Sequence, residues 1–165
     1  MEVLSSMNKF DMNYCCDSVE FCPYDPSYVI VGQYELLDRE SQKKTGGISL
    51  FQVNEDKHMK LIDSIETAAV FDCKFAPEQI NDKTCLAHCN TDGTIDIHML
   101  TFPQLNNSKQ LQLNINDNTD DIEDEAALSL AWYKTNKIVC SGSKGNISLY
   151  TRNEDNYTLL TNWKA

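Results

Sequence analysis

Asp17, Asp72 and Ser129 are the residues of this sequence whose type and place in the chain could support chemistry. Each stands at the start of a repeated pattern, immediately before a short segment expected to form an inner strand. Carboxylates gathered at the open end of such strands can act as a base or polarise water. Asp and Ser also cap strand entries by bonding nearby backbone groups, which is the structural alternative. The three residues are the candidate catalytic set.

Established enzyme motifs do not match the chain. Ser141-Gly142-Ser143 lies at a strand end and lacks the context of a nucleophile elbow. The sequence contains no phosphate loop, dinucleotide fingerprint or HExxH. Cys85 and Cys89 have CxxxC spacing, but no second pair follows at the spacing of a zinc site. We therefore expect no metal site.

For the remaining polar candidates, a structural role is favoured over a catalytic one. Asp92 precedes Gly93 in a turn, where a carboxylate braces the backbone. His88 alternates with apolar residues as a core histidine would, and His98 stands at a position where such repeats usually carry Trp. His58 lies in the charged stretch NEDKHMK, and we expect it to be exposed.

Internal repeats predict the fold. Copies starting at Asp17, Asp72 and Ser129 each contain an alternating segment, an apolar run, a reversal, a second alternating segment and a fourth strand. The starts are 55 and 57 residues apart, whereas a WD-repeat blade takes about 40–45. Insertions at 33–45 and 116–125 account for the excess, and the second, acidic one is expected to be a solvated loop.

The predicted fold class is all-β, a WD-repeat β-propeller made of four-stranded antiparallel blades at about 17–66, 71–115 and 128–162. Residues 8–15 alternate like the N-terminal strand that closes such a ring by joining its last blade. Three blades cannot close a ring. We therefore expect residues 1–165 to be the N-terminal part of one longer, seven-bladed domain, whose missing C-terminal blades are needed for closure.

The composition limits the kinds of partner that the protein can bind and the compartment in which we expect it. The net charge of −11, from 14 basic and 25 acidic residues, disfavours nucleic acid because phosphate binding needs a basic face. No apolar stretch is long enough to span a membrane, and the N-terminus does not resemble a signal peptide, so we expect a cytoplasmic protein. Seven cysteines without framework spacing fit free, mostly buried thiols.

An ordered set of motifs goes beyond a general propeller. The set comprises DSVEFCP at Asp17, the long insertion before GGISLFQV, FDCKFAP at Phe71, LSLAW at Leu128 and W-x-A at Trp163. Taken together over residues 16–165, these motifs resemble the diphthine methylesterase family, WD-repeat proteins of diphthamide biosynthesis. No catalytic motif of that family maps onto a residue of this chain.

The resemblance implies hydrolysis of a methyl ester on methylated diphthine. The implied partner is translation elongation factor 2, the protein substrate, and the implied chemistry uses no cofactor. The family's later blades have no counterpart in this sequence, so the chain alone need not be active. A non-catalytic scaffold for protein–protein interaction is the alternative, because a propeller fold by itself does not establish an enzyme.

Overall fold

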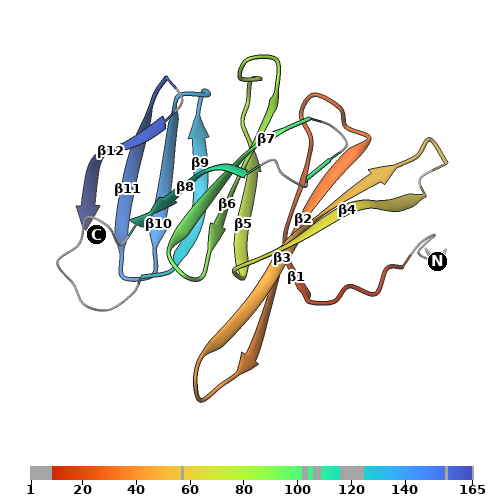
Figure 1. The fold of residues 1–165 in the computed structure, drawn as a ribbon, viewed down its shortest axis with the longest axis horizontal. Helices are drawn as coiled ribbons and strands as arrows, with labels where there is room; N and C mark the ends of the chain where they lie inside the picture. Colours follow the sequence, from red (N-terminus) through yellow and green to blue (C-terminus); the bar gives the residue numbers. More distant parts are fainter. Residues whose placement is uncertain are drawn as a thin grey trace, which may run out of the picture.

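A computed structural model of the chain describes residues 9–56, 58–101, 104–105, 109–115, 125–154 and 156–164. In this part of the chain the backbone forms twelve strands, grouped into three antiparallel sheets of four. Figure 1 shows the three sheets standing in a row, with the first at the N-terminal end of the molecule and the third at the C-terminal end. The predicted fold class is confirmed: the sheets are blades of an incomplete WD-repeat propeller.

Each blade uses consecutive strands. Blade 1 contains β1 (Cys15–Phe21), β2 (Tyr28–Asp38), β3 (Lys43–Val53) and β4 (Met59–Thr67). Blade 2 contains β5 (Val70–Phe75), β6 (Thr84–Asn90), β7 (Thr94–Leu100) and β8 (Lys109–Asn114). Blade 3 contains β9 (Ala127–Tyr133), β10 (Lys137–Gly142), β11 (Asn146–Asn153) and β12 (Asn156–Lys164).

Two tight turns depend on glycine. Gly93, between β6 and β7, has a φ of 81°, and Gly145, between β10 and β11, has a φ of 85°. Residues with a Cβ are strained at these angles, whereas glycine is not. These turns therefore reverse the chain where the repeat pattern predicts a reversal, and they join the second strand to the third in blades 2 and 3.

The first strand of each blade lies at the inner edge. β5 lies against both β1 and β9, so the three inner strands stand next to one another. Two cores join the blades. Ile30, Ile48 and Leu86 belong to the core between blades 1 and 2, and Cys140 and Tyr150 belong to the core between blades 2 and 3. Burial between sheets is what stabilises such stacked blades.

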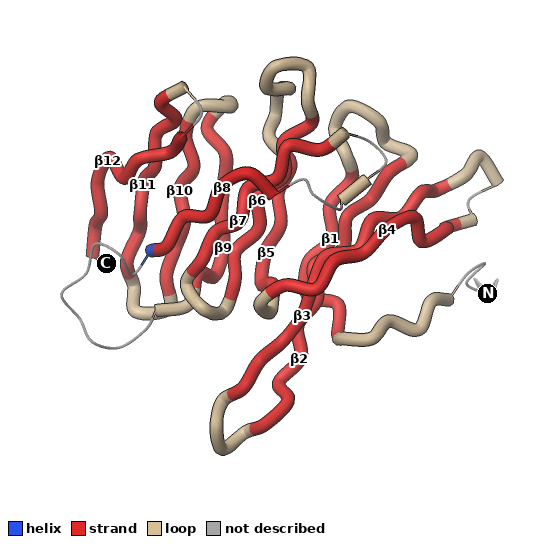
Figure 2. The backbone as a smooth tube through the Cα atoms, viewed as in Figure 1, coloured by secondary structure: helices blue, strands red, loops and turns tan. Residues whose placement is uncertain are grey.

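The insertion at 33–45 forms a regular hairpin arm. β2 and β3 stay paired to Asp38↔Lys43, whereas β1 pairs with β2 only as far as Cys15↔Tyr34 and β4 pairs with β3 only as far as Gly46↔Thr67. Residues 35–45 therefore extend beyond the sheet as a two-stranded ribbon. Figure 2 shows this ribbon projecting past the other strands at the lower edge of the view.

The N-terminal segment covers part of the outer face of blade 1. Phe10 contacts Phe51 edge-on, with ring centroids 5.3 Å apart, and Met12 packs against Val29 and Val31. Residues 9–14 form no strand, and β1 begins at Cys15. The closing strand therefore stays a prediction, but the segment lies on the face against which a last blade would stand.

The acidic insertion is only partly described. Residues 116–124 lie outside the described residues, but Glu125 is buried, with 2% of its surface exposed. The expectation of a solvated loop is wrong for this residue, because its carboxylate caps a turn of blade 3. Among the described residues, no helix is long and apolar enough to cross a membrane.

Candidate functional site

Backbone bulges mark the start of all three inner strands. The pairing of β1 with β2 skips Asp17, that of β5 with β6 skips Phe71, and that of β9 with β10 skips Leu128. A bulge leaves one residue unpaired and turns its side chain away from the regular pleat. Asp17 is therefore equivalent to Phe71 and Leu128.

This register corrects the alignment of the three internal repeats at one position. Asp72 and Ser129 follow their bulges directly, and the equivalent residue of blade 1 is Ser18. Asp17 lies one residue before the position equivalent to Asp72 and Ser129, because the bulge adds a residue before the regular pairing starts. Its side chain is exposed on β1.

Asp72 and Ser129 are brought into direct contact. The Ser129 hydroxyl of β9 donates a hydrogen bond of 2.8 Å to Asp72 Oδ2 of β5, and the backbone N–H of Leu130 donates to the same oxygen at 3.1 Å. Asp72 is buried, whereas Ser129 is exposed. The carboxylate therefore ties two inner strands of different blades together. A catalytic role for Asp17, Asp72 and Ser129 stays a prediction.

A second carboxylate makes the same kind of link one blade earlier. Glu20 Oε1 of β1 accepts a hydrogen bond of 3.2 Å from the backbone N–H of Phe75 on β5. Lys74 lies between the two acids, with its Nζ 3.0 Å from Asp72 Oδ1 and 3.3 Å from Glu20 Oε2. The inner strands are thus joined by an acid–lysine–acid series.

The environment shifts the ionisation of this series. Burial raises the pKa of the Glu20 carboxyl, and the Phe75 hydrogen bond and the Lys74 charge offset that rise only in part. Burial also acts to lower the pKa of Lys74, but the hydrogen bond and charge of Asp72, helped by Glu20, outweigh it and the pKa is raised. Lys74 therefore stays protonated and does not serve as a base at neutral pH.

An open groove of about 670 Å³ lies beside the bulges. The large apolar residues of its lining are Phe71 and Leu128, the bulged residues that precede Asp72 and Ser129. Phe71 also stacks on Tyr34 of β2, with ring centroids 5.4 Å apart. The other lining residues come from the arm, the blade connections and the second turns: Gln42, Lys44, Ala68, Thr91, Asp92, Ala126 and Ser143. The sequence carries no signal for this groove, although Phe71 and Leu128 directly precede the candidate residues Asp72 and Ser129.

Both core histidines are buried in blade 2 and contact each other. Their Nε2 atoms are 3.0 Å apart, and His88 Nδ1 lies 2.8 Å from Asn90 Oδ1. The Asn90 amide nitrogen donates to Thr94 and Asp96, so its oxygen accepts from His88 Nδ1–H. His88 Nε2 of the neutral ring then accepts from His98. The pair connects β6 to β7 at the position where Trp is usual.

Asp92 and His58 lie where the sequence indicated. Asp92 Oδ1 accepts hydrogen bonds from the Thr94 backbone N–H at 3.0 Å and the Thr94 hydroxyl at 2.6 Å, which braces the turn at Gly93. His58 is exposed at the β3–β4 turn. Neither arrangement adds a catalytic group.

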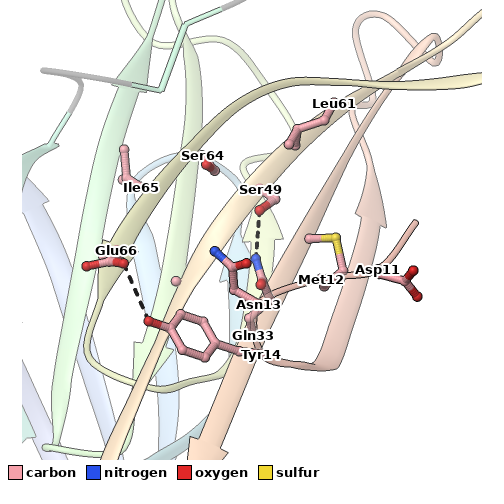
Figure 3. Close-up of a pocket in the computed structure, with 11 residues that line it drawn as sticks. Asp11, Met12, Asn13, Tyr14, Gln33, Ser49, Leu61, Ser64, Ile65 and Glu66 are labelled. Atoms are coloured by element: carbon pink, nitrogen blue, oxygen red, sulfur yellow. Dashed lines mark hydrogen bonds between the residues drawn. The ribbon is translucent and has the colours of Figure 1, made fainter.

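A polar cavity of about 150 Å³ lies beneath the N-terminal segment (Figure 3). Gln33 Nε2 donates to Ser49 Oγ at 2.6 Å on its inner side, and the Tyr14 hydroxyl donates to Glu66 Oε1 at 3.4 Å at its rim. The second bond holds Tyr14 against β4, the outermost strand of blade 1, whereas the first links β2 to β3. The cavity lies on the blade's outer face, away from the groove at the bulges.

The thiols form no disulfide in the structure, in keeping with the sequence expectation. Cys89 of blade 2 and Cys140 of blade 3 lie with their sulfurs 3.6 Å apart in the core. The hydrogen bond between them, together with burial, raises the pKa of Cys89. Within the described residues, no group of three or more His, Cys, Asp or Glu side chains is arranged to hold a metal ion.

Comparison with solved structures identifies the class as WD-repeat propellers. Sqt1 from Chaetomium thermophilum, a WD-repeat propeller, matches 92% of this chain with a TM-score of 0.65. The two sequences are 16% identical, so the likeness shows the fold. The chain spans 37% of the Sqt1 chain.

Comparison with curated proteins leads to a more specific relative. The chain is 26% identical over 178 aligned residues, 93% of its length, to the diphthine methyltransferase homolog of Dictyostelium discoideum. It spans 46% of that protein. No model of a known protein family matches the chain. The resemblance drawn from the ordered motifs is thereby confirmed as similarity to a protein named for diphthine.

Proposed function

We propose that the protein carrying this chain hydrolyses the methyl ester of methylated diphthine on translation elongation factor 2, a cytoplasmic step of diphthamide biosynthesis. The observation that carries the proposal is the similarity over 93% of the chain to a protein whose name specifies diphthine. That name describes a methyltransferase. The motif set of this chain resembles the methylesterase family, so ester hydrolysis is the reaction we propose.

The two reactions differ in what they consume. Hydrolysis adds water across the acyl–oxygen bond and releases a carboxylate, methanol and a proton. Methyl transfer forms an ester and needs a methyl donor. The groove beside the bulged residues is open to water, and Asp72 follows Phe71, which lines the groove, by one residue. A carboxylate near the groove can supply the base that an attacking water needs.

The experiment uses the full-length protein and elongation factor 2 that carries the methyl ester. Incubation without a methyl donor should release methanol and lower the mass of the factor by one CH2. A second incubation uses the factor with the free carboxylate, and a mass increase of one CH2 that requires S-adenosylmethionine would instead support methyl transfer.

A scaffold function is favoured by one observation. Asp72, the buried member of the candidate set, already bonds Ser129, Leu130 and Lys74. Tight binding of elongation factor 2 with no change in its mass under either condition would support a scaffold and reject the esterase.

A further inference from the structure

The hairpin arm at residues 35–45 has free backbone edges. Among the described strands, none pairs beyond Tyr34 with the edge of β2 that faces away from β3, and none pairs before Gly46 with the edge of β3 that faces away from β2. A two-stranded ribbon without other contacts has marginal stability in water. Its exposed N–H and C=O groups are also a template for pairing with another chain. Because the arm is regularly paired although it adds nothing to the sheet of blade 1, we infer that it contacts something outside this blade.

The edge of β3 borders the groove. Lys44 and Gln42 line the groove from the arm, whereas Thr91, Asp92 and Ser143 line it from the second turns of blades 2 and 3. Phe71 and Leu128 provide the apolar surface between them, and Leu128 is 40% exposed. A segment lying along β3 would therefore meet backbone bonding groups on one side and apolar side chains beneath.

The charge on this edge differs from that of the whole chain. Lys43 and Lys44 are adjacent on β3, in a chain with a net charge of −11. Exposed lysines on an edge also keep unrelated strands away. The apolar surface directly beside the same edge distinguishes a binding site from simple protection, because protection needs no such surface.

We propose that the arm and the groove dock an extended, acidic segment of the protein substrate. The segment adds a strand to the free edge of β3, places carboxylates near Lys43 and Lys44, and lays an apolar side chain over Phe71 and Leu128. Strand addition supplies affinity through main-chain hydrogen bonds, and the alternating side chains supply specificity. The identity of the substrate as elongation factor 2 rests on the proposed function.

The register provides a clean deletion. Glu35 and Thr45 are direct partners, so replacing residues 36–44 with Asn-Gly closes a two-residue turn and keeps the paired part of blade 1. A second variant reverses the charge with Lys43→Glu and Lys44→Glu. The matched control is Lys60→Glu, an exposed lysine on β4 of the same blade, paired with Gln52 near the opposite end of β3.

Binding of methyl-ester elongation factor 2 to the full-length protein and to each variant is measured by biolayer interferometry, with thermal melts to confirm folding. The arm deletion and the charge reversal should each raise Kd by about tenfold or more, whereas Lys60→Glu should change it by less than about twofold. Wild-type affinity should also fall as salt rises.

The outcomes separate this inference from the proposed function. Equal Kd values for the wild type and a folded arm deletion would overturn the docking site, as would a wild-type protein that binds no elongation factor. Arm-dependent binding without methanol release would support docking and reject the esterase. Methanol release with unchanged Kd in the arm deletion would do the reverse.

Discussion

Ser129 and Asp72 join two blades through a single hydrogen bond of 2.8 Å between the inner strands β9 and β5. The same carboxylate oxygen accepts a hydrogen bond from the backbone N–H of Leu130. This bond lies on the edge of β9 that faces away from β10. Each inner strand has one edge that pairs with no strand of its own blade. Asp72, like Glu20 one blade earlier, supplies an acceptor for that edge and so helps to fix the angle between blades.

Removing the acceptor should cost more than removing the donor. Asp72→Ala leaves the buried N–H of Leu130 without this acceptor, and we expect the free energy of unfolding to fall by about 1–3 kcal/mol. Ser129→Ala removes one hydrogen bond and should cost about 1 kcal/mol. Urea denaturation of the full-length variants measures both values. The double variant should lose less than the sum, because the two single changes remove a shared bond.

The same variants test the catalytic alternative. As a link between strands, Ser129 should be dispensable for chemistry, and Ser129→Ala should retain ester hydrolysis. A loss of about a hundredfold or more in a variant that remains folded would assign the hydroxyl to the reaction instead.

Glu125 should stabilise blade 3 through its cap. Its carboxylate accepts the Lys144 backbone N–H at 2.7 Å and the Asn146 side-chain amide at 2.5 Å. Glu125→Ala removes both acceptors, and we expect it to lower the free energy of unfolding by about 1–3 kcal/mol. Glu125→Gln keeps one acceptor oxygen and should cost less. Equal losses in the two variants, measured by urea denaturation, would contradict the capping role.

The repeat pattern could predict the strands because it reports burial on alternate faces. Three four-stranded sheets and the turns at Gly93 and Gly145 follow from that alternation. Glu125 could not be recognised, because an acidic run is usually solvated and only the fold brings its last residue against a turn. The arm could be recognised only as an insertion and not as paired strands, since residues 33–45 combine strand-forming and charged residues without a clear boundary.

The candidate site could be predicted only in part. Asp72 and Ser129 share a repeat position, and the structure brings them together. Asp17 was misaligned because a bulge adds one residue without changing the hydrophobic pattern. The groove depends on how Phe71 and Leu128 leave the pleat, and sequence alternation carries no signal for that.

Buried thiols should make the protein sensitive to alkali. Burial raises the pKa of Cys73 to about 11 and that of Cys85 to about 12, from an ordinary value of 9.0. Both stay neutral in the folded state at pH values where the unfolded chain loses the proton. Their contribution to stability is therefore complete below pH 9 and is lost as the pH rises through about 11 and 12.

Each thiol should account for about 2 kcal/mol of lost stability by pH 11. Free energies of unfolding of the full-length protein between pH 8 and pH 11, obtained by urea denaturation, provide the test. Cys73→Ala and Cys85→Ala should each make the decline shallower, although each lowers stability at neutral pH. Cys16→Ala, at an exposed position, is the matched control and should leave the slope as it is. Identical slopes in all three variants would contradict this explanation.

The outer face of blade 3 should drive association of these 165 residues when they are expressed alone. Ile147 of β11 and Trp163 of β12 are direct partners, 37% and 50% exposed, on the side opposite Tyr150, which is buried against blade 2. Leu160, which the register of β12 skips between Leu159 and Thr161, is 55% exposed. Blade 1, by contrast, has residues 9–14 over part of its outer face.

Burying on the order of 400 Å² of such apolar surface is worth about 10 kcal/mol at about 25 cal/mol per Å². That gain is comparable with the total stability of an ordinary domain, about 5–15 kcal/mol. We therefore expect the isolated chain to elute from size-exclusion chromatography as oligomers and to lack a sharp thermal transition. The double substitution Ile147→Glu with Trp163→Lys places opposite charges on directly paired positions and removes the apolar pair, so it should shift the chain towards monomer. As a control, Leu37→Lys on the arm removes an exposed apolar side chain elsewhere and should leave the oligomers unchanged. A sharp monomer peak with a cooperative melt for the unmodified chain would show that this face needs no cover.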